Sequence, residues 1–280
     1  MSAKSTTLLW KNYRVYTPKQ MKLYCGSIKR ILDPSMPIYG AEKKGLKSIA
    51  EKFKLTYRQV ESIREQLRIQ NDIYTGRDRQ KCRDVMAKSF KRLVDDIGDT
   101  ENEIFVHYRI RKFIKTIGQP ISYTIPTILK MPEYDSMPKI GTDYIDNLSQ
   151  IVMKRNNKSK ERARNMEIML EDYLKNMGIE FMTEEQMRND PDIKSTPDIL
   201  FKSPVEITVN DKTYTIKWMD AKNFILVGTK FLRTKLAKQA KKYGDEFGFG
   251  AFVFAEGIDC SVGVESALML DGSVLKKIQD

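Results

Sequence analysis

Two carboxylates and a lysine between residues 196 and 222 are the groups that a metal-dependent phosphodiesterase needs. Asp198 follows Thr196 and Pro197, and Asp220 and Lys222 come after a predicted hairpin. Successive side chains of an extended strand point to opposite faces, so Asp220 and Lys222 are expected to project together. Without further partners they could equally form an exposed salt-bridged pair, which is worth about 0 to 1 kcal/mol.

The charge of the chain favours a polyanionic partner. Among 280 residues, 49 are Lys or Arg and 37 are Asp or Glu, which gives a formal net charge of +12. A basic balance of this kind is typical of proteins that bind nucleic acid. No apolar run approaches the ~20 residues of a membrane span, and the start has no signal-like stretch. We therefore expect an intracellular, soluble protein with no membrane partner.

The few histidines and cysteines narrow the metal chemistry that the chain could support. His107 is the only histidine, and Cys25, Cys82 and Cys260 show no C-x-x-C pairing. Two-histidine nuclease chemistry is excluded, and neither a zinc module nor a disulfide framework is expected, so the thiols are predicted to be buried and reduced. Oxygen ligands must then hold any metal, and such ligands suit Mg²⁺ or Mn²⁺.

Periodicity and turn residues predict a compact α/β unit around the two aspartates. The expected elements, in order, are a helix that ends at Gly178, strands over 179–182, 197–201, 204–209 and 213–221, a basic helix over 229–243 and a buried strand over 250–255. Trp218, on the same strand face as Asp220, is expected in the core rather than stacked on a base.

A third carboxylate lies on the helix that precedes these strands. Glu167 and Glu171 share a helix face with two leucines, so Glu167 is expected near buried residues. A carboxylate in such a place is costly unless it has a partner or a metal. In the alternative, the helix is rotated so that Glu167 is solvated beside Arg164.

These motifs occur in an order that resembles the PD-(D/E)xK nuclease superfamily, which includes restriction endonucleases and archaeal Holliday junction resolvases. Four segments carry a more specific likeness: Thr196-Pro197-Asp198, Trp218-Met219-Asp220-Ala221-Lys222-Asn223, Gln239-x-x-x-Tyr243 and Gly248-Phe249-Gly250-Ala251. Together they resemble the TPD-motif family. The resemblance covers residues 167 to 254, with one departure, the long loop between Met182 and Thr196.

The resemblance implies a metal-dependent hydrolytic site. Its catalytic members would be Glu167, Asp198, Asp220, Lys222 and Gln239. Asp198, Asp220 and the Ala221 carbonyl would hold Mg²⁺ or Mn²⁺, with Glu167 bound directly or through water. The metal would polarise the phosphate and generate the nucleophile, while Lys222 would orient or deprotonate the water or stabilise charge on the phosphate.

Two further segments could contact nucleic acid. The helix over 229–243 carries six basic residues and no acids, and together with Gln239 it would hold the backbone of nucleic acid. The alternative is a solvated surface. The basic residues assigned to this role are Lys230, Arg233, Lys235 and Lys238.

Residues 45–67 contain two amphipathic helical units, with Thr56 as the expected N-cap of the second. This layout resembles a helix-turn-helix, whose second helix would present Arg58, Gln59 and Ser62 to a DNA groove. The turn lacks the glycine that is often found in such motifs. Two ordinary packed helices are the alternative.

The sequence therefore predicts a mixed α/β or α+β protein in two parts. Residues 1–150 would form an all-helical, helix-turn-helix-like nucleic-acid-binding region, and residues 151–280 a restriction-endonuclease-like domain with a mixed central sheet. The expected function is that of a divalent-metal-dependent nuclease. The alternative is a non-catalytic nucleic-acid-binding or adaptor protein that keeps the nuclease fold as a scaffold.

The expected partner is nucleic acid, with DNA favoured, and a homodimer is left as an open alternative. In organisms that possess codanin, the family resemblance also implies a codanin-like protein partner. It favours a nuclear location over a cytoplasmic one.

Overall fold

The computed structural model describes residues 7–32, 40–74, 79–119 and 121–278, and the chain divides into two compact units. The first unit comprises 1–30, 48–67 and 160–280, and the second comprises 31–47 and 68–159. This division differs from the predicted boundary after residue 150, which falls inside helix α7 (Lys139–Asn176). The helix is continuous because the chain has no proline or glycine between Gly141 and Gly178.

The first unit is built on a mixed sheet in which the described residues form six strands. The strand order is β1-β4-β5-β6-β8, and β3 also pairs with β4. Strands β4 and β5 form an antiparallel hairpin, whereas the β1–β4, β5–β6 and β6–β8 pairs are parallel. The strand bounds are β1 Thr7–Leu9, β3 Phe181–Thr183, β4 Ile199–Val209, β5 Lys212–Lys222, β6 Gly250–Phe254 and β8 Ala267–Asp271.

The hairpin that carries Asp220 follows from its turn residues. Asn210 and Asp211 both have positive φ angles, 47° and 63°, which the type I′ turn of a two-residue hairpin requires. The predicted hairpin is therefore confirmed. A separate pair of short parallel strands, β2 (Val15–Tyr16) and β7 (Ile258–Asp259), also belongs to this unit.

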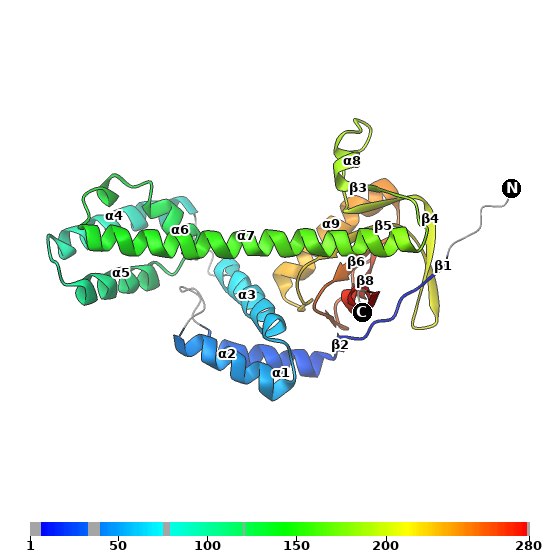
Figure 1. The fold of residues 1–280 in the computed structure, drawn as a ribbon, viewed down its shortest axis with the longest axis horizontal. Coiled ribbons are helices and arrows are strands. Elements are labelled where there is room, and N and C mark those ends of the chain that lie inside the picture. The colour runs from blue at the N-terminus through cyan, green and yellow to red at the C-terminus, as the bar shows by residue number, and fades with distance from the viewer. Residues whose placement is uncertain (1–6, 33–39, 75–78, 120, 279–280) are drawn as a thin grey trace. The chain divides into compact units, whose positions relative to one another are not determined.

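Two helices cover the sheet, as Figure 1 shows. The C-terminal part of α7 packs Leu170 and Leu174 against the face that contains Met219. Helix α9 (Lys230–Phe247) packs Leu236 against the face that contains Trp218. The other helices with residues in this unit are α1 Pro18–Lys29, α2 Gly40–Phe53, α3 Tyr57–Tyr74, α8 Glu184–Arg188 and the 3-10 helix η2 Gly272–Ile278.

Local signals set the ends of the two covering helices. Gly178 follows α7 with φ +69°, a left-handed conformation that glycine adopts without strain. The Thr229 hydroxyl accepts a hydrogen bond from the Leu232 amide and caps the start of α9.

At Gly250 a Cβ would lie 2.1 Å from the Trp218 ring, so only glycine lets the strand approach this indole. Trp218 is fully buried, which confirms its predicted place in the core.

The second unit is helical and has its own apolar core. Phe90 of α4, Ile110 and Ile114 of α5, Ile125 of α6 and Ile145 of α7 are completely buried there. Within this unit His107 stacks on Tyr144, with ring centroids 4.0 Å apart. The additional elements are α4 Arg79–Ile97, α5 Glu103–Ile117, α6 Ile121–Ile128 and the 3-10 helix η1 Pro132–Tyr134.

Three further expectations can be compared with this fold. The mixed α and β composition and the mixed sheet are confirmed, but the N-terminal part is not all-helical, because β1 pairs with β4 across the sheet. Cys25 is half-buried and Cys260 is exposed, so burial was predicted wrongly for Cys260, and the side chain of Cys82 lies outside the described residues. Across the described ranges, no helix has the length and apolar character to cross a membrane.

Candidate active site

The start of β4 and the end of β5 bring Asp198 and Asp220 together. Ile199 pairs with Met219 in the antiparallel register, so the residues just beyond this pair lie side by side. The Ala221 amide donates a hydrogen bond of 2.6 Å to Asp198 Oδ2 and holds that carboxylate against β5. The hairpin therefore places two carboxylates at one edge of the sheet.

Asp220 is buried, with 3% of its surface exposed, and three side chains donate to its carboxylate. Lys222 Nζ donates to Oδ1, and Gln239 Nε2 donates to Oδ2 over 2.8 Å. The Tyr243 hydroxyl lies 3.2 Å from the same Oδ2. Asp220 and Lys222 share a face as predicted, and the alternative of an exposed pair is wrong because their side chains are only 5% and 18% exposed.

Tyr243 is a member of this cluster that the predicted site omitted. Its hydroxyl accepts from Gln239 Nε2 over 3.0 Å and also reaches the Thr196 carbonyl oxygen at 3.3 Å. Burial, followed by the charge of Asp220, raises the pKa of Tyr243 well above its usual range, so the hydroxyl stays protonated and can donate. The i, i+4 spacing of Gln239 and Tyr243 on a helix is the signal that could have identified it.

The two carboxylates repel each other within a poorly solvated site. Burial, followed by the negative charge of Asp220, raises the pKa of Asp198 to about 8. A cation between the two acids would relieve this repulsion. Mg²⁺ ordinarily takes one or two protein carboxylates and keeps several waters, so Asp198 and Asp220 are donors that could hold it. In the part of the chain that the structure describes, no three His, Cys, Asp or Glu side chains converge closely enough to hold a metal.

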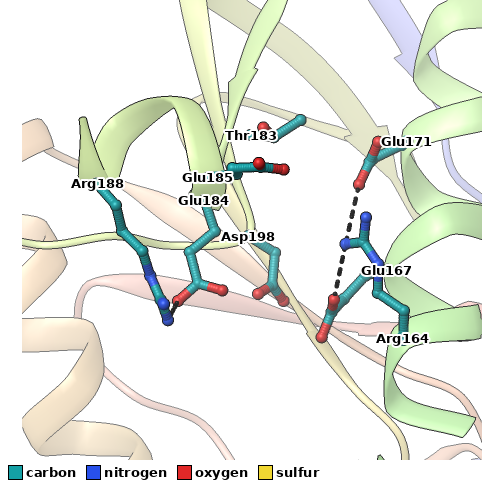
Figure 2. A pocket seen from close by; sticks show the side chains of 8 residues that line it. All are labelled: Arg164, Glu167, Glu171, Thr183, Glu184, Glu185, Arg188 and Asp198. Atoms are coloured by element: carbon teal, nitrogen blue, oxygen red, sulfur yellow. Dashed lines mark hydrogen bonds and ion pairs between the residues drawn. The ribbon is translucent and has the colours of Figure 1, made fainter. Parts of the chain in front are cut away.

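Glu167 lies on α7, beside the same site. Its Oε2 is 3.2 Å from Arg164 Nη1, and its side chain is 26% exposed. This matches the alternative in which Glu167 is partly solvated beside Arg164. Figure 2 shows Glu167 and Asp198 lining one cavity between α7 and the β3–α8 segment. The cavity encloses about 240 Å³, and its lining residues are Arg164, Glu167, Glu171, Thr183, Glu184, Glu185, Arg188 and Asp198.

Comparison with known proteins assigns the chain to a family. The model of a family described as "protein of unknown function TPD sequence-motif" matches residues 141–269. An uncharacterized protein of Acanthamoeba polyphaga mimivirus is 34% identical over 266 residues, which cover 95% of each chain. The chain belongs to the TPD sequence-motif family. No solved structure matches the chain.

The span that matches the TPD family model contains the carboxylates, Lys222 and Gln239. Side chains of α9 hold the Thr196-Pro197-Asp198 motif, which gives the family its name, in position. Tyr243 reaches the carbonyl of Thr196, and Glu246 Oε1 accepts a hydrogen bond of 2.8 Å from the Lys194 amide. Helix α9 therefore anchors the segment that leads into Asp198.

The basic residues of α9 in this TPD protein fall into two groups. Lys230, Lys235 and Lys238 are exposed and so can meet a nucleic-acid backbone. Arg233 instead donates to the Gly228 carbonyl and to both the carbonyl and hydroxyl oxygens of Ser261. The guanidinium of Arg233 thus ties the start of α9 to neighbouring loops, and its contact with a nucleic-acid backbone stays a prediction.

The residues predicted to read DNA from α3 belong to the first unit and make contacts inside it instead. Gln59 is 3% exposed, and its Nε2 donates to the Glu256 carbonyl at 2.9 Å and to the Tyr16 hydroxyl at 2.7 Å. Its Oε1 accepts from the Thr56 amide at 2.8 Å. The Ser62 hydroxyl accepts from the Ile225 amide at 3.1 Å. Gln59 and Ser62 are therefore engaged within the protein, and the predicted base contacts are corrected.

Arg58 is also bound within the first unit. Its Nε lies 2.9 Å from Glu256 Oε1, and its Nη2 donates to Asn223 Oδ1. Glu256 is almost fully buried, so the ion pair neutralises a carboxylate that would otherwise be costly. The helix pair is thus a structural part of the unit. Thr56-x-x-Gln59 forms a capping box, and this spacing is the local signal that could have indicated a structural role for Gln59.

Gln59→Ala is expected to lower the free energy of unfolding by about 1 to 3 kcal/mol, because it leaves buried polar groups without their partner. Chemical denaturation measures this change. Ser48→Ala, an exposed change on the same helix pair, should shift stability by less than about 0.5 kcal/mol. A Gln59→Ala protein with unchanged stability but weaker DNA binding at every salt concentration would restore the DNA-reading interpretation.

Proposed function

We propose that this TPD-family protein is a divalent-metal-dependent nuclease with a PD-(D/E)xK type of fold and site. The observation that carries the proposal is the meeting of Asp198, Asp220 and Lys222 at adjoining strand ends, with Gln239 bound to Asp220. A buried aspartate, a half-buried aspartate and a lysine at one place suit cation-assisted attack on a phosphodiester bond. The substrate is nucleic acid, with DNA favoured by analogy with the superfamily.

The donor set fits a hard cation. Asp198, Asp220 and the Ala221 carbonyl would hold Mg²⁺ or Mn²⁺. Glu167 does not converge with the two aspartates in the described structure, so it would join through a water or directly after its side chain moves. When bound, the cation supplies Lewis-acid polarisation of the phosphate and a more acidic water. The pKa of Asp198, raised to about 8 chiefly by burial and then by Asp220, supports a cation at this place.

The other side chains orient the acids and the substrate. Gln239 and Tyr243 donate to one oxygen of Asp220 and so fix the direction of its carboxylate. Lys222 is held by Asp220 and lies over the Phe252 ring, with Nζ 5.3 Å from the centroid. This ammonium would stabilise negative charge that develops on the phosphate, or orient the attacking water. The exposed lysines of α9 would hold the flanking backbone.

A second candidate is a non-catalytic nucleic-acid-binding or adaptor protein. The observation that favours it is that Asp220 already accepts hydrogen bonds from Lys222 and Gln239, while Glu167 is paired with Arg164. These contacts satisfy the carboxylates without a cation. A codanin-like partner and a nuclear location, both proposed from the family resemblance, are compatible with either function.

Cleavage assays with labelled single-stranded, duplex and branched DNA and with RNA test the proposal. We expect Mg²⁺ or Mn²⁺ to support cleavage of at least one of these substrates and EDTA to abolish it. Binding without cleavage of any substrate in either metal would favour the scaffold function. Cleavage that persists in EDTA would show that the reaction does not depend on a divalent metal.

A further inference from the structure

Arg164 projects from α7 into the cavity that Asp198 also lines. Its Nη1 lies 3.2 Å from Glu167 Oε2 and 3.6 Å from Glu171 Oε1, so one positive group bridges two carboxylates (Figure 2). Glu167 is the acid proposed to join the cation site. Arg164 therefore makes with Glu167 the kind of contact that the divalent cation would also make.

We infer that Arg164 competes with the divalent cation for Glu167 and that, once displaced, its guanidinium binds a phosphate of the nucleic-acid substrate. This inference rests on the proposed nuclease function. It assigns Arg164 two linked roles: it opposes metal binding in the absence of substrate, and it contributes to substrate binding when metal is present.

The contacts of Arg164 favour such an exchange. The Arg164 side chain is 60% exposed, and exposed ion pairs are weak. Glu171 also pairs with Lys175, whose Nζ lies 3.2 Å from Glu171 Oε2, so Glu171 keeps a cation when Arg164 leaves. A divalent ion carries twice the charge of a guanidinium, and carboxylate oxygens are its preferred ligands. The Glu167 carboxylate would therefore exchange its contact with Arg164 for a contact with the metal.

The chemistry of the guanidinium explains where it would go. Its planar array of N–H donors matches two phosphate oxygens at once, and arginine remains charged throughout the physiological pH range. Because Arg164 and Asp198 line one cavity, a phosphate at the two aspartates would be within the region that Arg164 faces. The four glutamates around this cavity would repel a phosphate, so a cation and a released arginine are both needed to admit one.

Arg188 provides a matched control. It lines the same cavity and carries the same charge, but it pairs with Glu184, on its own helix, at 2.7 Å. Its side chain is exposed to a similar degree, 67%. Arg188→Ala therefore removes one positive charge from the cavity and leaves the Arg164–Glu167 pair in place.

The first measurement is Mn²⁺ binding in the absence of nucleic acid, followed by the EPR signal of free Mn²⁺. Wild type should bind Mn²⁺, and Asp220→Ala should abolish this binding. Arg164→Ala should bind Mn²⁺ about threefold to tenfold more tightly than wild type, because a competing charge is removed. Arg164→Lys should fall between the two, and Arg188→Ala should stay within about twofold of wild type.

The second measurement is the salt dependence of binding to a labelled oligonucleotide, with Ca²⁺ in place of Mg²⁺ to limit cleavage. Arg164→Ala should weaken binding and lower the slope of log affinity against log salt by about 0.7 to 0.9, the loss of one phosphate contact. Arg164→Lys should retain most of the slope. The variant is expected to fold, because alanine favours an exposed helical position.

The outcomes separate this inference from the nuclease proposal. Tighter Mn²⁺ binding together with a smaller salt slope in Arg164→Ala, but not in Arg188→Ala, supports the exchange. Asp220-dependent Mn²⁺ binding that Arg164→Ala leaves unchanged overturns the exchange and leaves the nuclease site standing. Equal effects of the two arginine variants overturn it in favour of a general charge effect. Failure of wild type to bind Mn²⁺ overturns the metal site itself.

Discussion

Asp220→Ala is expected to lower the rate of metal-dependent cleavage by at least about a thousandfold, because it removes a proposed metal ligand and the acceptor that orients Lys222 and Gln239. Lys222→Ala should lower the rate by about a hundredfold to a thousandfold, since it removes one charge-stabilising group. Single-turnover rates at saturating Mg²⁺ measure both effects.

The control for these variants is Lys212→Ala, at the exposed start of the same strand, which should change the rate by less than about twofold. Thermal unfolding must show that both site variants remain folded. Cleavage by Asp220→Ala and Lys222→Ala at the wild-type rate would place the chemistry elsewhere. Loss of cleavage in Asp220→Ala with unchanged Mn²⁺ binding would keep the site but remove Asp220 from the metal ligands.

Asp198→Asn is expected to abolish cleavage and yet stabilise the protein in EDTA. The pKa of Asp198 is raised from 3.8 to about 8 by burial and then by Asp220, so the folded state favours the protonated carboxyl. The unfolded chain releases that proton near pH 4. Stability in EDTA is therefore lost as the pH rises from about 4 through about 8, and an amide, which resembles the protonated carboxyl, avoids this loss.

Denaturation in EDTA at pH 5 and pH 8 measures the effect. The gain in the free energy of unfolding from Asp198→Asn should be at least about 1 kcal/mol larger at pH 8 than at pH 5. The asparagine can still accept from the Ala221 amide, so the hairpin keeps its hydrogen bond. Asp192→Asn, an exposed change, should shift stability by less than about 0.5 kcal/mol at either pH. An effect of Asp198→Asn that is the same at both pH values, or destabilising, would mean that the pKa of Asp198 is not raised in the folded protein.

The local pattern around the aspartates could be predicted well. The turn at Asn210 and Asp211, the common face of Asp220 and Lys222, and the end of α7 before Gly178 all follow from backbone geometry within a few residues. Such features depend on the sequence spacing of neighbours, which requires no knowledge of the rest of the fold.

Partner choice over long distances could not be predicted in the same way. Gln59 and Arg58 had the residue types and spacing of a DNA-reading helix, but contacts with Tyr16, Glu256 and Asn223 hold both side chains within the first unit, and only Gln59 is buried. These partners lie between 43 and 198 positions away in sequence. Arg233 likewise donates a hydrogen bond to the carbonyl oxygen of Ser261, a partner that its place in the sequence did not indicate.

Local spacing was enough to predict which residues share a strand or helix face and where turns and helix ends fall near glycine and asparagine. It did not give every boundary, since the predicted strands over 197–201 and 204–209 are one strand, β4. The sequence also shows the Thr196-Pro197-Asp198 motif with Glu167 before it and Asp220 after it, in the order that the family resemblance requires. Contacts between distant segments set which surface covers each face: they buried Gln59, brought Tyr243 to Asp220 and paired Glu167 with Arg164. The physical reason is that burial and charge pairing depend on contacts between distant segments, which local spacing does not specify.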